Sequence, residues 1–600
     1  MASINLEESY PLEGKWGDIR DRMEKASIPT PTGITRDRYL DVAERIVRAL
    51  ADYQDETGAI VDPYHRDEHR LIHAQTRFVG ALGRLIAAGR RLDLIEACVK
   101  GYEGYLMRLH EVEHAPEFWV KELMYAHGAL RDKIPLERLG RWKEVWCTHV
   151  PRSQYKAACG GLRYHNLVVF VLTSEFFKIE QGLGGDQELI EEAIRYLSQD
   201  FTAYGMYRDP DDPMTYDLVV KQQLDLVRAC GYAGEHRAWI TEICRRGALT
   251  SLLCQSVTGQ MPFGGRSNQF HFVEAHFACL CESQARFYKD MGDSIMAGVF
   301  KRAGRRAFQI TLPWIMDMEP LRQIKQGFHP RLEHGLDSGG YYTVYGALAA
   351  SLCGTAYHLA DEEIEERITP AELGGFVFDL WPGFHKVFAT CEGYHVEVDT
   401  RADHRKDATG LGRLHRIGVW PETALSGSIS SDANYTFGVE RAHRNLAFGP
   451  AWKDAEGQEH CLADLESEIE DVRLTIRKET PEEVCFEMAY RGDLGGCSTI
   501  IEAYSLTSKG LAYSIDLHPE PSASYILVPV IISDGQIEAS ILEAPCGMDV
   551  MYRGAVYGIR LRAGKMGAFT EDPPAPNRNA LYRTWKVCDE KVRVFLRREK

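Results

Sequence analysis

The sequence predicts an α+β protein of two domains, an N-terminal toroid of paired α-helices followed by an antiparallel β-sandwich. The chain has 600 residues, more than one hydrophobic core usually organises, so at least two domains are expected. From about residue 35 to 365, apolar residues recur at spacings of three and four, the period of an amphipathic helix. From about residue 372 the segments become short, rich in β-branched and aromatic residues, and bounded by turns. We place the boundary in the charged stretch around Pro370, which gives domains 1–370 and 371–600.

The helical part contains about eleven or twelve candidate helices, separated by short loops with Gly, Pro and Asp. Paired helices of this length favour an (α/α)6-type toroid, in which helical hairpins surround a central cavity. The alternative is an open solenoid, but the sequence lacks the fixed-period repeat that solenoids show. The clearest helical segments are Tyr39–Tyr53, Thr76–Ala88, Leu92–Leu109, Trp119–Leu130, Leu189–Leu197, Leu218–Cys230, Arg237–Leu253 and Tyr342–Leu359.

The second part contains short segments with the composition of strands, and their number predicts a β-sandwich. They are Phe376–Leu380, Lys386–Cys391, Tyr394–Arg401, Val472–Lys478, Val484–Tyr490, Ser498–Leu506, Leu511–Leu517, Tyr525–Ile532, Ala555–Leu561 and Val592–Leu596.

Composition and charge narrow the class of protein. Hydrophobic residues make up 44% and charged residues 26%, as in globular proteins, and the net charge of −17 argues against a nucleic-acid partner. No apolar run approaches the roughly 20 residues that span a bilayer, and the N-terminus shows no signal-peptide pattern. The 15 cysteines are scattered, without CxxC pairs, which is typical of reduced thiols. We therefore expect a cytoplasmic protein without a membrane partner, and a homodimer as its assembly, because symmetric dimers are the commonest oligomers.

The densest polar cluster lies between Gly264 and Cys279, in the sequence GGRSNQFHFVEAHFAC. A helix from about Ser267 would place Asn268, His271 and Glu274 on one face, beside Arg266 and His276. Apolar residues surround these groups, so a plain solvated surface explains them poorly. An amide, an imidazole and a carboxylate on one face could bind an anionic sugar or move a proton.

A second cluster, Arg163-Tyr164-His165-Asn166, follows two glycines and precedes an apolar helix. The positive end of a helix dipole and its unpaired amides favour an anion, such as the carboxylate of a uronic acid. The alternative is that Asn166 simply caps the helix. The order of residue types repeats that of the first cluster, which favours a shared function.

Further candidates lie in turns that could line the rim of one cavity, with a core or turn role as the alternative. They are Tyr207, Arg208 and Tyr216 in an Asp-rich loop, His114 and Trp119 at a helix start, and His334 and Tyr342 around a Gly-rich turn.

One strand of the second part could hold a metal. His395, Glu397 and Asp399 alternate along it and share one face, and His404 on the following loop could complete a site. The alternative is a hydrated strand face. We expect that no cofactor is required. The alternative is a structural divalent metal held by His395, Asp399 and His404. His404 is also a candidate substrate contact.

This layout resembles the heparinase II/III-like and the alginate or oligoalginate polysaccharide lyases, the rhamnose–glucuronate lyases, and a β-glucuronidase family of the same architecture. The resemblance covers most of the chain in layout, but in motif only Arg163–Asn166 and Arg266–His276. Those lyases often carry Asn-Asn-His followed by Trp, from which Asn268-Gln-Phe-His271 departs.

The resemblance implies β-elimination next to the carboxylate of a uronic acid. Asn268 and Arg266 would neutralise that carboxylate, and His271 would act as the base or share the neutralising role. Tyr164, Tyr207 or Tyr216 would protonate the leaving oxygen, and His165 and Asn166 would orient the sugar.

Two alternatives remain open. Hydrolysis of a glucuronide needs two carboxyl groups, for which Glu274, Glu117, Glu122 and Asp209 are available. A glycan-binding protein without activity is the third. Elimination creates an unsaturated uronate that absorbs ultraviolet light, and hydrolysis does not.

Overall fold

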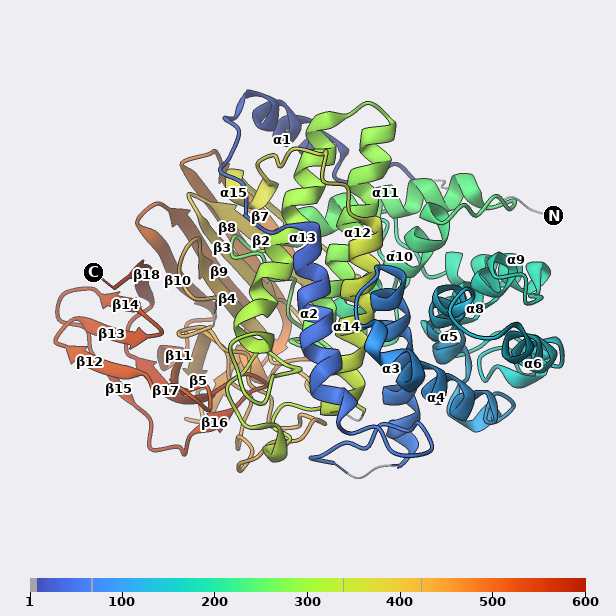
Figure 1. Ribbon diagram of the computed structural model, residues 1–600. Coiled ribbons are helices and arrows are strands. Elements are labelled where there is room, and N and C mark those ends of the chain that lie inside the picture. The colour runs from blue at the N-terminus through green and yellow to red at the C-terminus, as the bar shows by residue number, and fades with distance from the viewer. Residues whose placement is uncertain (1–7, 66–67, 338, 382, 422, 600) are drawn as a thin grey trace. The chain divides into compact units, whose positions relative to one another are not determined.

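The computed structural model describes residues 8–65, 68–337, 339–381, 383–421 and 423–599 (Figure 1). The chain divides into two compact units. The helical unit comprises residues 1–251, 270–323 and 338–368, and the β unit comprises 252–269, 324–337 and 369–600. A single cut at residue 370 therefore leaves out two segments, 252–269 and 324–337, which precede the cut in the sequence but pack with the β unit.

Six helices of the described chain form a closed ring in the helical unit. Along the ring, α3 contacts α5, α5 contacts α8, α8 contacts α10, α10 contacts α12, α12 contacts α14, and α14 returns to α3. Their bounds are α3 Glu68–Ala87, α5 Glu117–Leu130, α8 Leu167–Glu180, α10 Met214–Ala229, α12 His271–Asp290 and α14 Tyr342–Leu359. The prediction of a closed ring rather than an open solenoid is confirmed.

A second set of helices packs against this ring. Contacts join α2 to α3 and α14, α4 to α3 and α5, α9 to α8, and α13 to α12. The bounds are α2 Arg36–Ala51, α4 Ile95–Leu106, α6 Leu136–Cys147, α9 Gln187–Ser198, α11 Arg237–Cys254 and α13 Ser294–Ile315. The shorter α1 spans Glu13–Lys25, α7 spans Pro151–Gln154 and α15 spans Pro370–Leu373.

Burial separates the two sets of helices. In α2, the buried residues recur at helical spacing along one stripe that includes Tyr39, Ala43, Ile46 and Leu50, as in an amphipathic surface helix. In α5, buried residues run almost without interruption from Glu117 to Leu130, as expected for a helix enclosed on all sides.

The described part of the β unit contains three antiparallel sheets (Figure 1). Their orders are β1-β2-β3-β4, β12-β13-β14-β18-β10-β9-β8-β7 and β15-β17-β11-β5-β6, with β16 paired to β17. The bounds are β1 Phe376–Asp379, β2 Lys386–Cys391, β3 Tyr394–Asp399, β4 Gly410–Arg416, β5 Gly449–Lys453, β6 Glu459–Cys461, β7 Ile469–Glu479, β8 Glu483–Leu494, β9 Cys497–Thr507, β10 Gly510–His518, β11 Ala523–Ser533, β12 Ser540–Ala544, β13 Gly547–Tyr552, β14 Ala555–Leu561, β15 Gly567–Phe569, β16 Ala575–Pro576, β17 Leu581–Val587 and β18 Lys591–Arg598.

One apolar core joins the three sheets. It takes Val396 from the first sheet, Tyr504 and Tyr513 from the second, and Trp452 and Trp585 from the third. Strands of the eight-stranded sheet alternate buried and less buried residues, so each presents one face to this core. The predicted antiparallel sandwich is confirmed.

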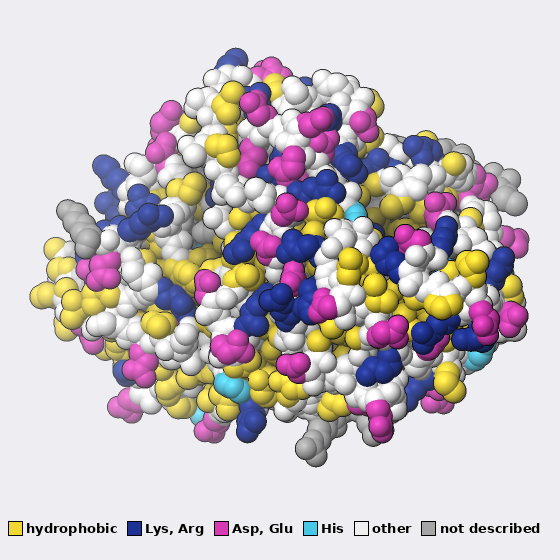
Figure 2. Space-filling view, viewed as in Figure 1, with side chains coloured by type: hydrophobic (Ala, Val, Ile, Leu, Met, Phe, Trp, Pro, Cys, Tyr) yellow, Lys and Arg dark blue, Asp and Glu magenta, His cyan; other side chains and the backbone are white. Residues whose placement is uncertain are grey.

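One face of the molecule carries charges of both signs. Lys and Arg side chains are interspersed with Asp and Glu over the face shown in Figure 2. Among the described residues, no helix combines the length and the apolar character needed to cross a bilayer.

Candidate functional site

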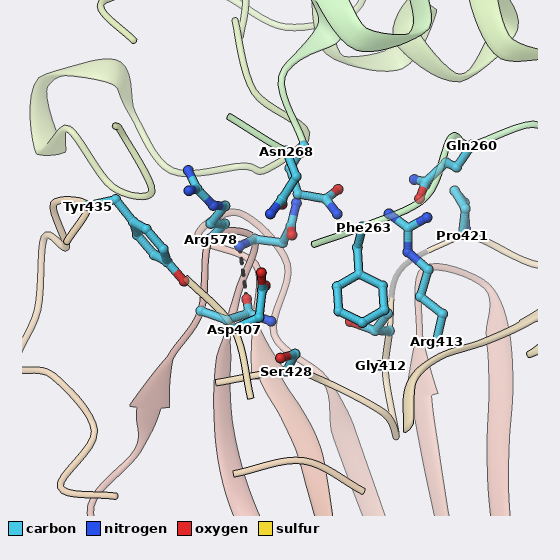
Figure 3. Close-up of a pocket in the computed structure, with 14 residues that line it drawn as sticks. Gln260, Phe263, Asn268, Asp407, Gly412, Arg413, Pro421, Ser428, Tyr435 and Arg578 are labelled. Atoms are coloured by element: carbon cyan, nitrogen blue, oxygen red, sulfur yellow. Dashed lines mark hydrogen bonds between the residues drawn. The ribbon is translucent and has the colours of Figure 1, made fainter. Parts of the chain in front are cut away.

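A small polar pocket lies within the β unit, and Figure 3 shows the side chains around it. Its volume is about 30 Å³, which admits one or two water molecules or a carboxylate, but not a whole sugar ring. Asn268, Phe263 and Asp407 lie between Tyr435 and Arg578 on one side and Gln260 and Arg413 on the other. The remaining lining residues are Gln269, Gly412, Pro421, Thr423, Ser428, Asn577 and Asn579.

The turn that carries Asn268 precedes α12 and is not part of it. Ser267 and Gln269 have φ angles of 61° and 71°, in the left-handed region, and Phe270 is extended, so the helix begins only at His271. The prediction of a helix from Ser267 was therefore wrong. The Asn268 amide instead donates to the Gly265 carbonyl at 2.7 Å and faces the pocket.

Asp337 and Asp407 fasten this turn to the rest of the β unit. The Ser267 amide donates to Asp337 at 2.5 Å, and the Gly265 amide donates to Asp407 at 2.6 Å. These contacts hold Asn268 at the pocket wall.

Two buried guanidinium groups line the pocket. Arg578 donates to Asp337 at 2.7 Å and to the Gly335 carbonyl at 2.9 Å, and it lies 3.8 Å from the centre of the Tyr435 ring. Arg413 donates to the Met261 carbonyl at 2.6 Å and lies 3.4 Å from Glu397. Both guanidinium groups already face a carboxylate, but the Nε atom of Arg578 is buried without a hydrogen-bond partner among the described residues, so it can still donate to an anionic group.

Gly412 lets the ring of Phe263 pack against the backbone beside Arg413 in the pocket wall. A Cβ atom on Gly412 would lie 1.9 Å from the ring of Phe263, so any larger residue would displace that ring. Phe263 is held in turn by its amide, which donates to Glu397 at 3.0 Å.

Asp407 is the titratable acid of the pocket. Burial raises its pKa to about 6, against the lowering effect of Lys386 and of the Gly265 amide. Such a group exchanges a proton near neutral pH, as a general acid or base must. Burial also raises the pKa of Tyr435 above its usual value, so its hydroxyl stays protonated and donates to the Lys406 carbonyl at 2.9 Å.

The first predicted cluster is divided between the two units, because Arg266 and Asn268 belong to the β unit and His271 to the helical unit. His271, Glu274 and His276 lie in the first two turns of α12, and all three are buried. His276 shares a hydrogen bond of 2.8 Å with Gln222, and burial holds its pKa well below the usual value. Its imidazole is therefore neutral and part of the interior of the ring.

The second predicted cluster forms an exposed turn before α8. Tyr164 and His165 have φ angles of 66° and 43°, and Arg163 donates to the Gly160 carbonyl at 2.9 Å. The side chain of Asn166 makes no capping bond; its amide donates to both carboxylate oxygens of Asp209 at 2.9 Å. The capping alternative for Asn166 was therefore wrong. Convergence of this turn with the Asn268 turn on one hollow stays a prediction, because the two turns lie in different units.

The prediction that the Asp-rich loop places Tyr207 at a cavity mouth is wrong. Tyr207 is completely buried, with its ring centre 5.4 Å from that of Phe201. Arg208 is exposed and forms a bidentate pair with Asp212 at 2.9 and 2.8 Å. Tyr216 is half-buried in the first turn of α10.

Other rim candidates have mainly structural surroundings. Trp119 is completely buried and packs edge-on against Tyr105 at 5.0 Å, so the prediction that it stacks on a sugar was wrong. Tyr342 is buried at the start of α14 and packs edge-on against Tyr64 at 5.1 Å. The side chain of His114 lies outside the described part of the structure.

His334 supports the pocket without lining it. Its Nε2 atom shares a hydrogen bond of 2.8 Å with the carbonyl of Asn577, a lining residue, and its ring stacks on Phe328 at 3.9 Å. Burial lowers its pKa to about 4, so the ring is neutral at pH 7. His404 lies elsewhere, 3.5 Å from Glu466.

The predicted metal face on β3 carries other interactions. Every residue of β3 is buried, so the alternative of a hydrated face was wrong. His395 shares a hydrogen bond with Thr390 at 3.0 Å, and Asp399 pairs with Lys386. His395, Asp399 and His404 do not come together as ligands.

Another group among the described residues lies close enough to share a metal, namely Glu191, Glu235 and His236. Arg195 already pairs with Glu235 at 2.7 Å, and Tyr232 donates to Glu191 at 2.5 Å. Both carboxylates therefore already have partners within the protein.

The four carboxyl groups available for hydrolysis are all at most 2% exposed. Glu117 accepts from the amides of Lys156 and Ala157 at 3.2 and 2.9 Å, and Glu122 accepts from Ser351 at 2.5 Å. Asp209 accepts hydrogen bonds from the side chain of Asn166, and Glu274 is buried in the first turn of α12. Glu117, Glu122 and Asp209 are therefore each engaged in hydrogen bonds within the helical unit.

The sequence argument missed Asp407, Arg413, Tyr435 and Arg578. Asp407 lies between β3 and β4, and Arg578 lies between β16 and β17. The one available signal was the polar triplet Asn577-Arg578-Asn579 directly after Pro576.

Comparison with known proteins supports the fold. No family model matches the chain, and no curated protein does. Heparinase III, a solved structure, shares 8% identity, covering 99% of this chain and 92% of that chain with a TM-score of 0.50. A chondroitin AC lyase from Streptomyces coelicolor A3, solved with chondroitin sulphate, shares 11% identity over 97% of this chain and 80% of that chain, with a TM-score of 0.48. The similarity to heparinase III confirms the predicted resemblance to heparinase II/III-like enzymes for the fold alone.

Proposed function

We propose that this protein is a carbohydrate-active enzyme that cleaves the glycosidic bond at a uronic acid residue of an acidic oligosaccharide by β-elimination. The observation that carries the proposal is the position of Asp407. An acid with a pKa of about 6 shares a carboxylate-sized pocket with the Asn268 amide and two guanidinium groups.

The chemistry of elimination matches these groups. Asn268, Arg413 and Arg578 compensate the charge of the uronate carboxylate, which makes the neighbouring C5 proton more acidic. Ionised Asp407 accepts that proton, the C4–O bond breaks, and a C4–C5 double bond forms. The hydroxyl of Tyr435 turns from the Lys406 carbonyl and supplies a proton to the leaving oxygen.

The fold is the second support, because the structure of this chain is similar to that of heparinase III over 99% of its length. We further propose that the reaction needs no metal, that the enzyme acts in the cytoplasm and that it forms a homodimer. The 15 free cysteines of the chain agree with a reducing compartment. Chelation with EDTA should leave the rate unchanged.

The test uses a panel of uronate oligosaccharides followed by ultraviolet absorbance and by sugar analysis. We expect Asp407→Asn to lower turnover about 10²–10⁴-fold and Asn268→Ala about 10²–10³-fold. The rate should rise with pH through about 6, because the base must be ionised.

Asp432→Asn is the control. Asp432 is an exposed residue three positions before Tyr435 in the sequence, and it does not line the pocket. Cleavage without a gain in absorbance would assign the protein to the hydrolases. Full activity of Asp407→Asn would remove the pocket from the mechanism, and no turnover of any uronate would favour a glycan-binding protein.

A further inference from the structure

A second hollow of about 440 Å³ lies on the sheet face formed by β9, β10, β18 and β14. It shares no lining residue with the pocket around Asp407. Strand alternation explains its floor. Tyr504 and Tyr513 point to the core, where both hydroxyls donate to Glu502 at 3.1 and 2.5 Å. The residues on either side of each tyrosine along its strand therefore face outward.

Those outward positions are small. Ser505 pairs with Ala512 across β9 and β10, and Ala503 pairs with Ser514. None of the four fills the space above the sheet, so a trough remains where larger side chains would project. We call this trough, with its charged side, the basic groove.

Four cations form the charged side of the basic groove: Arg560, Arg562, Lys591 and Arg593. Ala512 pairs with Arg593, and Arg593 pairs with Arg560 on β14, so two guanidinium groups stand directly opposite each other. Like charges in this position destabilise a sheet unless an anion compensates them.

Compensation from the protein is incomplete. Arg560 lies 2.7 Å from Asp549, and Arg562 donates to Asp589 at 2.9 Å. Lys591 and Arg593 are exposed, and no carboxylate of the described chain lies within ion-pair distance of either. Two unpaired cations thus stand over a hydroxyl-bearing trough in a protein whose net charge is −17.

We propose that the basic groove is a second binding site, which holds an acidic glycan strand by its carboxylate or sulfate groups. The choice of a glycan as the ligand rests on the proposed function. The inference that the ligand is an anion rests on the cations of the groove alone. Its volume falls in the range of ligand sites, roughly 300–1,000 Å³. Ser514 offers its hydroxyl to sugar hydroxyls, whereas the hydroxyl of Ser505 already donates to Glu483 at 3.4 Å. Tyr504 and Tyr513 are buried and offer no stacking face to a nucleic-acid base. Such a site would keep an acidic glycan on the enzyme between cleavage events.

The test measures binding of a heparin hexasaccharide and a hexagalacturonate to the full chain carrying Asp407→Asn, so that cleavage does not interfere. In that background, the double variant Lys591→Ala/Arg593→Ala should weaken binding at least tenfold and reduce its dependence on salt. Ala512→Trp should also weaken binding, because it fills the trough without changing the charge.

The matched control is Arg473→Ala/Arg491→Ala, which removes two exposed cations from β7 and β8 of the same sheet. We expect its affinity to stay within twofold of the background. Equal losses in the two double variants, or no loss in the groove variant, would overturn the proposal. So would oligothymidylate that binds as tightly with the same dependence on Lys591 and Arg593.

The two proposals fail separately. Groove-dependent binding without turnover of any uronate would support the second site and count against the proposed function. Turnover of a uronate disaccharide, with unchanged glycan binding in both groove variants, would support the proposed function and count against the second site.

Discussion

Glu117 is buried in the first turn of α5, where the amides of Lys156 and Ala157 donate to its carboxylate at 3.2 and 2.9 Å. Burial raises its pKa to about 7, and the backbone hydrogen bonds only partly oppose that rise. The same sign holds at Asp407, where burial outweighs Lys386. At these two carboxyl groups, loss of water therefore raises the pKa more than hydrogen bonds and nearby cations lower it.

This shift predicts how stability depends on pH. An unfolded glutamate has a pKa of about 4.3, so between pH 4.3 and 7 the folded chain keeps a proton that the unfolded chain has lost. The stabilisation is complete below about pH 4.3 and disappears as the pH rises through about 7. Glu117→Gln should remove up to about 1.4 kcal/mol per pH unit from the slope of the unfolding free energy in that window. Urea unfolding at several pH values measures the slope.

Glu113→Gln is the control, because Glu113 is an exposed glutamate just before the same helix. It should leave the slope unchanged. Equal slopes in the wild type and in Glu117→Gln would mean that Glu117 is already ionised in the folded protein at pH 5.

At the scale of elements, close approach of helices closes the ring. A Cβ atom on Gly83 in α3 would lie 2.6 Å from the backbone of Ala126 in α5. On α14, a Cβ atom on Gly354 would lie 2.4 Å from the side chain of Arg84. Both glycines permit helix contacts that a methyl group would prevent.

Gly83→Ala should therefore destabilise the protein, although alanine is the better helix former. The backbone of Ala126 cannot move aside as a side chain does, so α3 and α5 must separate, at a cost of about 1–3 kcal/mol. Gly140→Ala is the matched change in α6, where nothing lies within 4 Å. That variant should gain about 0.5–1 kcal/mol. Thermal or urea unfolding compares the two, and a stabilised Gly83→Ala would show that the helices are not in such close contact.

At the scale of the whole molecule, the cysteines report on accessibility. All 15 are free thiols, and Cys147, Cys159, Cys546 and Cys588 are the exposed ones. Nine others are buried, which blocks reagents, and burial also raises the thiol pKa at Cys98; Cys230 and Cys485 are half-buried.

Labelling of the native protein with a maleimide should modify these four exposed cysteines first, and denaturation should make all 15 reactive. A reducing agent should leave the thermal midpoint unchanged, because no disulfide is present to break. Intact-mass and peptide analysis give the sites. A rapid reaction at Cys98 or a reducing-agent effect on the midpoint would contradict the expectation.

The sequence by itself determined the two-part fold and most of its elements. Lys386–Cys391 is predicted and observed with the same bounds, and Tyr342–Leu359 likewise. This works because helix and strand periods follow from local backbone geometry, and burial of one face imprints them on nearby residues.

The candidate site was decided by tertiary structure. The sequence singled out Asn268, which does line the pocket, but not Asp407 or Arg578, which reach it from distant loops. It also placed Asn268 and His271 on one helix face, whereas left-handed residues at Ser267 and Gln269 separate them into different units. No local pattern records which loops meet or how deeply a carboxyl group is buried, because both depend on packing between residues far apart in the chain.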